Sequence, residues 1–477
     1  MQPADPTSLL TPPRRSLGFI LTALGVGAIA SILDSTIVNV AVDHLANVFS
    51  ANLSETQWVI TGFLLAMAAV VPVSGWLLDR FGGRRTWMLS LTVFFIGSVL
   101  CGIAWSLPAL IAFRIVQGLG AGLILPVLMA VLTKEAGKDR LMSAMGIFTL
   151  IIQVGPIFGP VIGGLLIDAA NWRWIFLVNI PFCIIGLILA PLTLEDDKPT
   201  HNDHRPFDLV GLLLSVPAVT GFVFGTSNLG PDHDFMHTDV WLPLAIGAAL
   251  LIAFVAWSHS HADHALIDVH LFRRRSFALS SINSVLLGFT TFGGMLLIPL
   301  YFQSLHGSTP LQAGLLLVPQ GVGTALVVIL GKKLLTGVPA RTRLILGFLI
   351  MAVGTVPFAI AEHHDATWLL VMTLVIRGIG IGLCAPTLNT VAMLDLAPDE
   401  LGRGSAAFNI VQRVGAPMGT TVLAVLLASA LERGSGSTAE VAAAFSSTFW
   451  WSILLTAIPV ALSLLLPRTS TVKSIGA

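Results

Sequence analysis

The chain has 477 residues, of which 55% are hydrophobic and only 10% are charged, and its acidic and basic side chains are equal in number. A soluble domain has about 25% charged residues, so this composition excludes a soluble globular fold, and the zero net charge gives no indication of a nucleic-acid partner. The three cysteines, Cys101, Cys183 and Cys384, lie scattered in apolar runs without the spacing of a disulfide or a metal site. We therefore predict an all-α integral membrane protein.

Hydrophobic runs of membrane-spanning length follow one another along the chain. A helix needs about 20 apolar residues to cross a bilayer. The first run follows Arg14 and Arg15, as a signal peptide would, but it contains Asp34 and has no convincing cleavage site, so we expect it to remain as the first span. The sequence predicts fourteen spans, at residues 17–43, 57–78, 86–105, 108–132, 142–168, 174–193, 208–228, 240–258, 277–303, 312–331, 343–361, 367–392, 403–430 and 447–466.

The lysines and arginines test this count, because cytoplasmic loops of membrane proteins are enriched in them. With the N-terminus inside, twenty of the 25 basic residues lie in inside segments, two in outside segments and three within spans. The two outside are Arg173 and Arg433, and the three within spans are Arg114, Arg377 and Arg413. A missed span would invert every later loop, so the asymmetry predicts fourteen spans with both termini in the cytoplasm.

An internal repeat relates the two ends of the chain. Residues 118–126 read GLGAGLILP and residues 378–386 read GIGIGLCAP, and the same shift of 260 residues carries QVG at 153–155 onto RVG at 413–415. Parallel repeats of this kind build transporters from two bundles with a substrate path between them. The predicted division is an N-terminal six-helix bundle at 1–194, a linker with two extra spans at 195–269 and a C-terminal six-helix bundle at 270–477.

Four motifs resemble those of a known family. Asp34 lies in LDSTIVNVAV of the first span, and residues 75–85, between spans two and three, read GWLLDRFGGRR. The fourth span carries RIVQGLGAG from Arg114, and the fifth carries GPIFGPVIGG from Gly155, followed by WRWIFLVNIP at 172–181. Together they resemble the major facilitator superfamily and, within it, the fourteen-span drug:proton antiporters, over the whole chain.

The resemblance implies the two-bundle fold, export and proton coupling, and the motif of the fifth span is associated with antiporters in that superfamily. One departure is visible. The corresponding loop of the second half reads GKKLLTGVPAR from Gly331 and has Leu335 where the first half has Asp79, which implies an asymmetric cytoplasmic gate.

Asp34 is the predicted proton carrier, and Arg114 is its predicted partner. A buried carboxylate costs about 2.5–3.5 kcal/mol on insertion scales, and desolvation and a nearby cation act on its protonation in opposite directions. Counted from the outer ends of their spans, the two residues differ in depth by roughly 5 Å, which an arginine side chain can bridge. The alternative interpretation is a static ion pair between two helices.

Two further motifs predict moving parts. The loop after the second span is a candidate cytoplasmic latch. The alternative is that its basic residues only set the orientation of the chain in the membrane. The residues of this loop are Gly75, Asp79, Arg80, Gly82, Arg84 and Arg85. In the fifth span, glycines four residues apart predict close helix packing, and the prolines between them predict a bend. This segment is therefore either a hinge or an ordinary helix-packing face. The residues of this antiporter motif are Gly155, Pro156, Gly159, Pro160, Gly163 and Gly164.

Polar residues within spans are the candidates for a substrate cavity. Arg377 and Arg413 have no acidic residue near them in their own spans, so we expect them to face a water-filled cavity, to bond backbone carbonyls, or to contact an anionic or zwitterionic substrate. Amide side chains could add polar contacts there or bond neighbouring helices, and they are Asn39, Gln117, Gln153, Asn389, Asn409 and Gln412.

These observations favour a proton-coupled antiporter that exports amphipathic small molecules by alternating access across the cytoplasmic membrane. We expect a monomer surrounded by membrane lipids, with protons as the coupling ion, no cofactor, no metal, no nucleic-acid partner and no enzymatic activity. A dedicated exporter or flippase of lipids, siderophores or secondary metabolites is the nearest alternative. Uptake by symport and a sensor or enzyme on a transporter scaffold remain as further classes.

Overall fold

The computed structural model describes residues 17–71, 73–194, 208–228, 236–261, 269–334, 337–360, 367–396, 400–433 and 437–466. This part of the chain is helical apart from turns and short connections, and it contains no strand. In chain order its helices are α1 Leu17–Ile37, η2 Val38–Val40, α2 Val42–Phe49, α3 Leu53–Thr56, α4 Trp58–Val70, α5 Val73–Phe81, α6 Gly83–Gly102, α7 Leu107–Ala169, α8 Trp174–Leu177, α9 Asn179–Thr193, α10 Leu209–Ser227, α11 Thr238–Ser260, η3 Val269–Arg273, α12 Arg275–His306, α13 Pro310–Leu334, α14 Ala340–Val353, α15 Val356–Ile360, α16 Thr367–Met393, α17 Leu401–Glu432 and α18 Thr438–Leu464.

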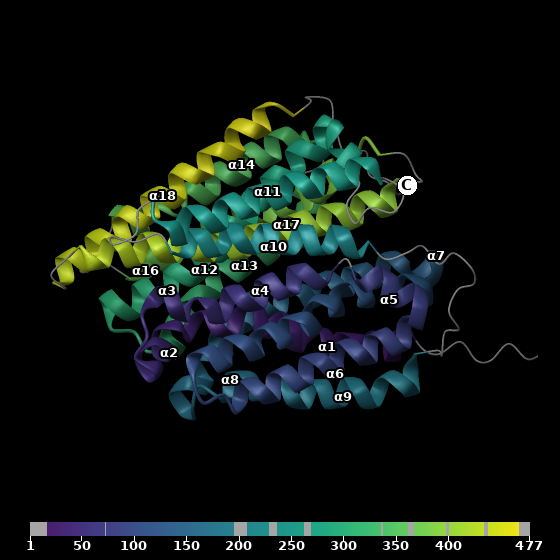
Figure 1. The fold of residues 1–477 in the computed structure, drawn as a ribbon, viewed down its shortest axis with the longest axis horizontal. Helices are drawn as coiled ribbons and strands as arrows, with labels where there is room; N and C mark the ends of the chain where they lie inside the picture. The colour runs from purple at the N-terminus through teal and green to yellow at the C-terminus, as the bar shows by residue number, and fades with distance from the viewer. Residues whose placement is uncertain are drawn as a thin grey trace, which may run out of the picture.

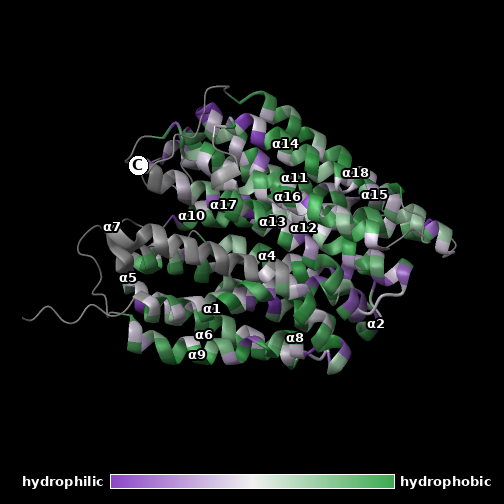
Figure 2. Cartoon of the chain, turned by 180° about the vertical axis from the view of Figure 1, so that it is seen from behind, coloured by the Kyte–Doolittle hydropathy of each residue, from purple (hydrophilic) through white to green (hydrophobic). Residues whose placement is uncertain are grey.

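Thirteen segments of the described chain are long and apolar enough to cross a membrane. The predicted span at 142–168 lies in the second part of α7, where the described apolar stretch is the shorter Phe158–Ala169. Hydrophobic residues cover most of the helix surfaces, and hydrophilic residues gather mainly near helix ends (Figure 2). The predicted all-helical membrane class is therefore confirmed, whereas the number fourteen stays a prediction.

The second predicted span, 57–78, is divided in the structure. Its apolar segment is Leu53–Val70, and a separate helix, α5, begins at Val73. The sequence has Pro72 between the two helices, and a proline cannot donate the backbone hydrogen bond that would continue a helix. The cytoplasmic loop motif therefore begins within its own short helix.

Helix α7 contains two antiparallel limbs that both pack on α1. In the first limb, Ser31 of α1 donates a hydrogen bond to the carbonyl of Ala121 at 3.4 Å. In the second limb, Thr36 donates to the carbonyl of Gly155 at 3.0 Å. Along the first limb, Arg114 contacts Asp34 and the later Ala121 contacts the earlier Ser31. Along the second limb, Gly155 contacts Ile32 and the later Gly163 contacts the later Ile37. The chain therefore reverses direction between the two limbs, which are the predicted spans four and five.

The helices form two groups, as Figure 1 shows. Helices α1 to α9 lie together at the bottom of the view, with α1 packed against α7 and α9. Helices α12 to α18 lie together at the top, with α12 packed against α16 and α17. Helices α10 and α11 pack on each other, and α10 also contacts α17 and α4. We call the two groups the first and second halves; the predicted boundaries at 194 and 269 adjoin segments outside the described residues and stay predictions.

Hydroxyl and amide groups join the halves near the predicted outer end. The Thr61 hydroxyl of α4 lies 3.1 Å from that of Thr420 and 3.2 Å from that of Thr421, both in α17. Thr61 and Thr421 also donate to the side-chain carbonyl of Gln57 at 2.6 and 3.3 Å. All four residues are fully buried, so this cluster excludes water from the junction.

Small residues close the same end between α7 and α13. A Cβ atom on Gly314 would overlap the carbonyl oxygen of Pro160, and one on Gly164 would overlap the backbone of Pro310 and Leu311. The two helix backbones therefore touch without intervening side chains. We call these contacts, together with the Thr61–Thr420 cluster, the outer seal.

The other end of the junction differs from the outer seal. The axes of the two halves diverge toward the end that carries α5 (Figure 1). Along one face of α17, Thr420 is buried, Arg413 is half-buried, and Asn409 is exposed. Accessibility on this face thus rises from the predicted outer end toward the predicted cytoplasmic end.

Substitution of Gly314 by alanine should weaken the outer seal, because the added methyl group would overlap the Pro160 carbonyl. Overpacking costs about 1–3 kcal/mol, which is roughly a five- to hundredfold change in population. We expect distances between spin labels at the outer ends of the halves to shift toward the open state. Gly62→Ala is the matched control, since its Cβ would meet only ordinary contacts at 3.5 Å or more. Equal distance distributions in both variants would contradict this role of the seal.

Candidate functional site

Asp34 lies in the interior of the first half with no exposed surface. Its Oδ2 accepts a hydrogen bond from Arg114 Nη1 at 2.5 Å. Its Oδ1 accepts from Gln117 Nε2 at 2.9 Å and from Asn179 Nδ2 at 2.8 Å. Three helices, α1, α7 and α9, therefore meet at one carboxyl group. The predicted pairing of Asp34 with Arg114 is present in the structure.

The guanidinium of Arg114 is enclosed as completely as its partner, with 1% of its surface exposed. Besides Asp34, it donates from Nε to the carbonyl of Val59 at 3.0 Å and from Nη1 to Gln117 Oε1 at 2.7 Å. Its Cζ lies 3.9 Å from the ring centroid of Phe63, a cation–π contact that strengthens when water is excluded. Arg114 thus keeps several partners that do not depend on Asp34.

The geometry at Asp34 fits its ionised form. An ionised carboxylate only accepts hydrogen bonds, whereas a protonated one must also donate. All three partners of Asp34 present N–H donors to it, so a proton on either oxygen would face a donor. Gln117 is itself held in place by donating to Ser98 at 2.8 Å. Protonation of Asp34 would therefore require at least one of these bonds to rearrange.

The glycines of the α7 motif pack on α1 directly beside Asp34. A Cβ on Gly155 would lie 2.7 Å from the carbonyl oxygen of Ile32, and one on Gly163 would lie 2.6 Å from that of Ile37. A Cβ on Gly159 would overlap the side-chain hydroxyl of Thr36. The predicted close packing of this face is thus present, and Pro160 and Gly164 of the same limb form part of the outer seal. The side chain of Pro156 lies outside the described residues.

The predicted cytoplasmic latch is described only in part. Gly82 has φ +78°, a conformation that favours glycine, and it precedes α6. Thr86 donates to the carbonyls of Leu77 and Gly82 at 3.0 and 2.8 Å, which fixes α5 against α6. At Gly75, no atom of the described residues lies within 4 Å of a Cβ placed there.

The charged residues of this loop lie near the surface. Arg80 and Arg85 are exposed and Arg84 is half-buried. Arg80 lies over the ring of Trp76, with 5.5 Å from its Cζ to the ring centroid. The side chain of Asp79 lies outside the described residues, as does that of Leu335, so the predicted latch stays a prediction.

Three of the predicted cavity residues are enclosed instead. Gln117 belongs to the Asp34 site, and Asn39 is buried and donates to the carbonyl of Thr36 at 3.0 Å. Arg377 is 1% exposed and donates to Gln320 Oε1 and to the carbonyl of Thr290, both at 2.6 Å. Bonding to a backbone carbonyl is one of the outcomes expected for Arg377, and it leaves the side chain turned away from water.

The remaining predicted cavity residues are more accessible. Arg413 and Gln412 are half-buried, and Asn409 and Asn389 are exposed. Both asparagines donate from their amide nitrogens to backbone carbonyls of their own helices, at 2.9 and 3.0 Å. The side chain of Gln153 lies outside the described residues. The accessible set therefore centres on Arg413 and α17.

Sequence reasoning missed two residues of the Asp34 site. Asn179 begins α9 and is 1% exposed, and Ser98 in α6 is fully buried. Each is a polar residue in an otherwise apolar span, which is the signal that could have identified it. Their relation to Asp34 depends on how four helices pack, and residue spacing along the chain does not give that packing.

A second carboxyl group lies nearer the predicted outer face. Asp43 is in the short helix α2, beyond the first membrane span. Burial raises the pKa of Asp43 above its ordinary value, and the neighbouring His44 partly opposes this effect. Asp43 therefore takes up a proton more readily than a solvated aspartate does.

Comparison with known proteins identifies the family. The model of the Major Facilitator Superfamily matches residues 24–420. The chain is 38% identical over 421 residues to the multidrug resistance protein B homolog of Mycobacterium tuberculosis, covering 87% of this chain and 77% of that protein. It is 30% identical over 415 residues to the multidrug export protein EmrB of Haemophilus influenzae, covering 86% and 81%. The chain belongs to the Major Facilitator Superfamily and is a multi-pass membrane protein.

Solved structures share the fold. A bacterial homolog of the human lysosomal transporter Spinster, in an inward-facing and unoccupied conformation, aligns with a TM-score of 0.67 at 17% identity, covering 96% of this chain and 97% of that one. The POT family transporter PepTSo aligns with a TM-score of 0.69 at 13% identity, covering 94% and 98%. At these identities the likeness concerns the fold alone.

Substitution of Asn179 by leucine should lower transport activity, because it removes the hydrogen bond that α9 donates to Asp34. A hydrogen bond to a charged group contributes about 1.5–3 kcal/mol, so we expect the transport rate to fall roughly ten- to hundredfold in reconstituted vesicles. Thr193→Val is the control on the same helix, since the Thr193 hydroxyl donates to the Leu189 carbonyl of its own helix. An unchanged rate in Asn179→Leu would remove Asn179 from the site's function.

Proposed function

We propose that this protein is a proton-coupled antiporter that exports amphipathic small molecules across the cytoplasmic membrane by alternating access. Its relatives are named as multidrug resistance and export proteins, and its fold is that of a transporter family. We place both termini in the cytoplasm and propose a monomer in which protons are the coupling ion, with no cofactor and no catalytic activity. The observation that carries the proposal is a buried carboxylate held by three donors beside the packing face of α7.

The proton binds at Asp34 in this account. A charged carboxylate in the membrane interior is costly, and here Arg114, Gln117 and Asn179 offset that cost. A proton entering from outside neutralises Asp34 and removes the need for Arg114 as a counterion. Asp43 lies between the predicted outer surface and Asp34 along the chain and supplies a second group for proton uptake. The ionised geometry corresponds to the state after proton release to the cytoplasm.

Protonation is coupled to movement of the halves through α1 and α7. Asp34 lies between Ile32 and Thr36, which contact Gly155 and Gly159 of the second α7 limb. The opposite side of that limb contacts α13 through the outer seal. A change in how α1 packs at Asp34 therefore reaches the junction between the halves within about two helical turns.

The proton gradient supplies enough energy for concentrative export. One proton moving through 100 mV releases about 2.3 kcal/mol, which sustains a substrate gradient of roughly fiftyfold. A single titrating carboxyl group is therefore sufficient, and no second energy source is needed.

Arg413 is the proposed substrate contact. It is half-buried on the face of α17 that leads from the outer seal to the exposed Asn409. An arginine in this position suits a carboxylate, sulfonate or phosphate group of an amphipathic substrate. Arg377, by contrast, has its guanidinium engaged by Gln320 and Thr290, and we assign it a structural role.

Substitution of Asp34 by asparagine should abolish proton-driven export while the protein still inserts, because the carrier group is lost. The measurement is substrate efflux and internal pH in liposomes under an imposed pH gradient. Asp239→Asn is the matched control, since Asp239 is 66% exposed at the start of α11. Normal pH-driven export by Asp34→Asn would sink the proposal, and acidification of the liposome interior on substrate entry would indicate symport instead.

Substitution of Arg413 by glutamine should raise the KM for acidic or zwitterionic substrates about tenfold, the loss expected for one charge-assisted contact of about 1.4 kcal/mol. Cationic substrates should keep their KM. Arg377→Gln should instead lower thermal stability, because Gln320 and the Thr290 carbonyl lose their charged donor. Transport kinetics over substrates of three charge types, with melting curves for both variants, measures these effects. The two assignments would be contradicted if Arg413→Gln lowered the melting temperature more than Arg377→Gln does.

A further inference from the structure

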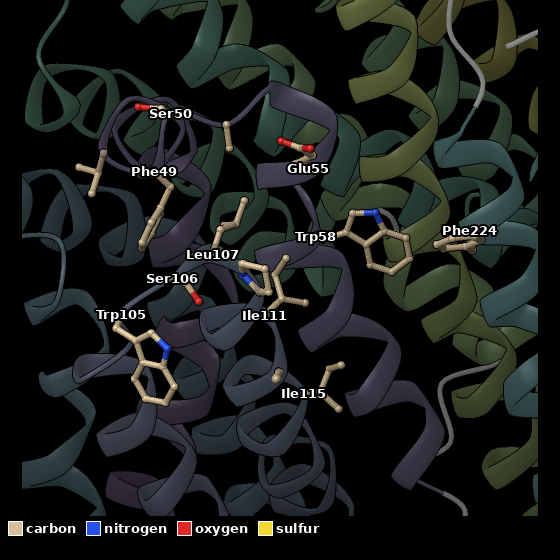
Figure 3. Close-up of a pocket in the computed structure, with 14 residues that line it drawn as sticks. Phe49, Ser50, Glu55, Trp58, Trp105, Ser106, Leu107, Ile111, Ile115 and Phe224 are labelled. Atoms are coloured by element: carbon tan, nitrogen blue, oxygen red, sulfur yellow. The ribbon is translucent and has the colours of Figure 1, made fainter. Parts of the chain in front are cut away.

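A pocket of about 870 Å³ lies outside the site described above, at the predicted outer end of the first half. Sites for small ligands have volumes of about 300–1,000 Å³. Side chains from the end of α2, from α3 and α4, from the start of α7 and from the end of α10 line it (Figure 3). We call it the outer pocket.

The lining changes from polar to apolar along the direction of the spans. Ser50, Glu55 and Ser106 lie at the predicted outer end, and Ile111 and Ile115 continue down α7. Ile115 is eight residues beyond the start of α7, which corresponds to a depth of about 12 Å. It is 43% exposed, so the lower part of the pocket opens toward the hydrocarbon of the bilayer. This is the polarity profile of an amphipathic molecule that lies along the membrane normal.

Glu55 is the only charged residue among the described residues that line the pocket. Its backbone N–H donates to Asn52 Oδ1 at 2.8 Å, and its Oε2 accepts from the Asn52 backbone N–H at 3.2 Å, which holds the carboxylate at the start of α3. The rim therefore favours a cationic head group over an anionic one.

Aromatic rings surround the same rim. Trp58 and Phe224 face each other with ring centroids 6.1 Å apart, and Trp105, on the opposite side, is 73% exposed. Figure 3 shows Glu55 above Trp58, with Trp105 across the pocket. Tryptophan faces attract ammonium groups, and tryptophan is favoured at membrane interfaces. Phe224 comes from α10, so the pocket lies between the first half and one of the extra spans.

We propose that the outer pocket binds one phospholipid of the outer leaflet that carries an ammonium head group. The ammonium lies at Glu55 and between the indole rings, and an acyl chain lies along Ile111 and Ile115. Lipid is the occupant favoured by position, because the apolar part of the pocket opens to the bilayer, where lipid is the solvent. The bound lipid fills the space between α7 and α10 and so ties an extra span to the first half. This assignment depends on the membrane placement and goes beyond the proposed export.

The test is native mass spectrometry of the full chain after release from nanodiscs of equal parts phosphatidylethanolamine and phosphatidylglycerol with the same acyl chains. We expect the wild type to retain one lipid molecule, and the complex with phosphatidylethanolamine to be at least three times as abundant as the complex with phosphatidylglycerol. Glu55→Gln should retain both equally, because glutamine preserves the helix cap but not the charge. Ala112→Trp, at an exposed lining position, should lose the retained lipid. Ile188→Trp, 59% exposed on α9, should behave as wild type.

Equal retention of the two lipids by the wild type would overturn the proposal, as would an undiminished preference in Glu55→Gln. If Ala112→Trp does not assemble, the comparison of wild type with Glu55→Gln decides alone. A further arm adds tetraphenylphosphonium, a lipophilic cation with no acyl chain. If the wild type retains that cation in place of lipid and Glu55→Gln does not, the pocket is a site for cationic substrates and the lipid assignment is wrong.

Discussion

A carboxylate enclosed by protein, with both oxygens bonded to N–H donors, is the constraint on which the rest of the structure depends. Asp34 has no exposed surface, and α7 and α9 place its hydrogen-bond donors around it. Two of the donors are in turn held by other groups, Arg114 by the Val59 carbonyl and Gln117 by Ser98. The first half is therefore organised around one charge, and any change in that charge alters how its helices pack.

The small residues of α7 connect this charge to the second half. Gly155, Gly159 and Gly163 allow the backbone of α7 to lie directly against Ile32, Thr36 and Ile37 of α1, because a side chain at any of these glycines would overlap them. Gly164 and Gly314 do the same between α7 and α13. Packing of this kind tolerates few intermediate arrangements, because backbone atoms in contact cannot shift gradually past one another. The second limb of α7 is thus in contact with both the proton site and the outer seal.

Sequence reasoning was accurate where one pattern carried the information. The hydrophobic runs predict helices that the structure contains, and counting residues from span ends placed Asp34 and Arg114 at similar depth, where they meet. The repeated glycines predicted close packing, which Gly155 and Gly163 show. Each of these inferences used only distance along one helix.

Inferences that depend on which way a helix faces were less accurate. For Gln117, a cavity contact and a bond to a neighbouring helix were both open, and the structure shows the bond to Asp34 of α1. Asn179 was not selected, although it bonds the same oxygen across 145 residues. A polar residue in a span predicts burial against some partner, but the identity of that partner is set by how several helices are rotated relative to one another.

The most direct measurement of the central claim is the protonation state of Asp34 in the working protein. Infrared difference spectra of wild type and Asp34→Asn, recorded in liposomes as the external pH is lowered, separate its carboxyl band from all others. The account predicts a protonated carboxyl band that appears in the wild type, is absent from the variant, and disappears when the protein opens to the cytoplasm. A wild type that exports its substrate against a gradient while Asp34 stays ionised in every state would contradict it.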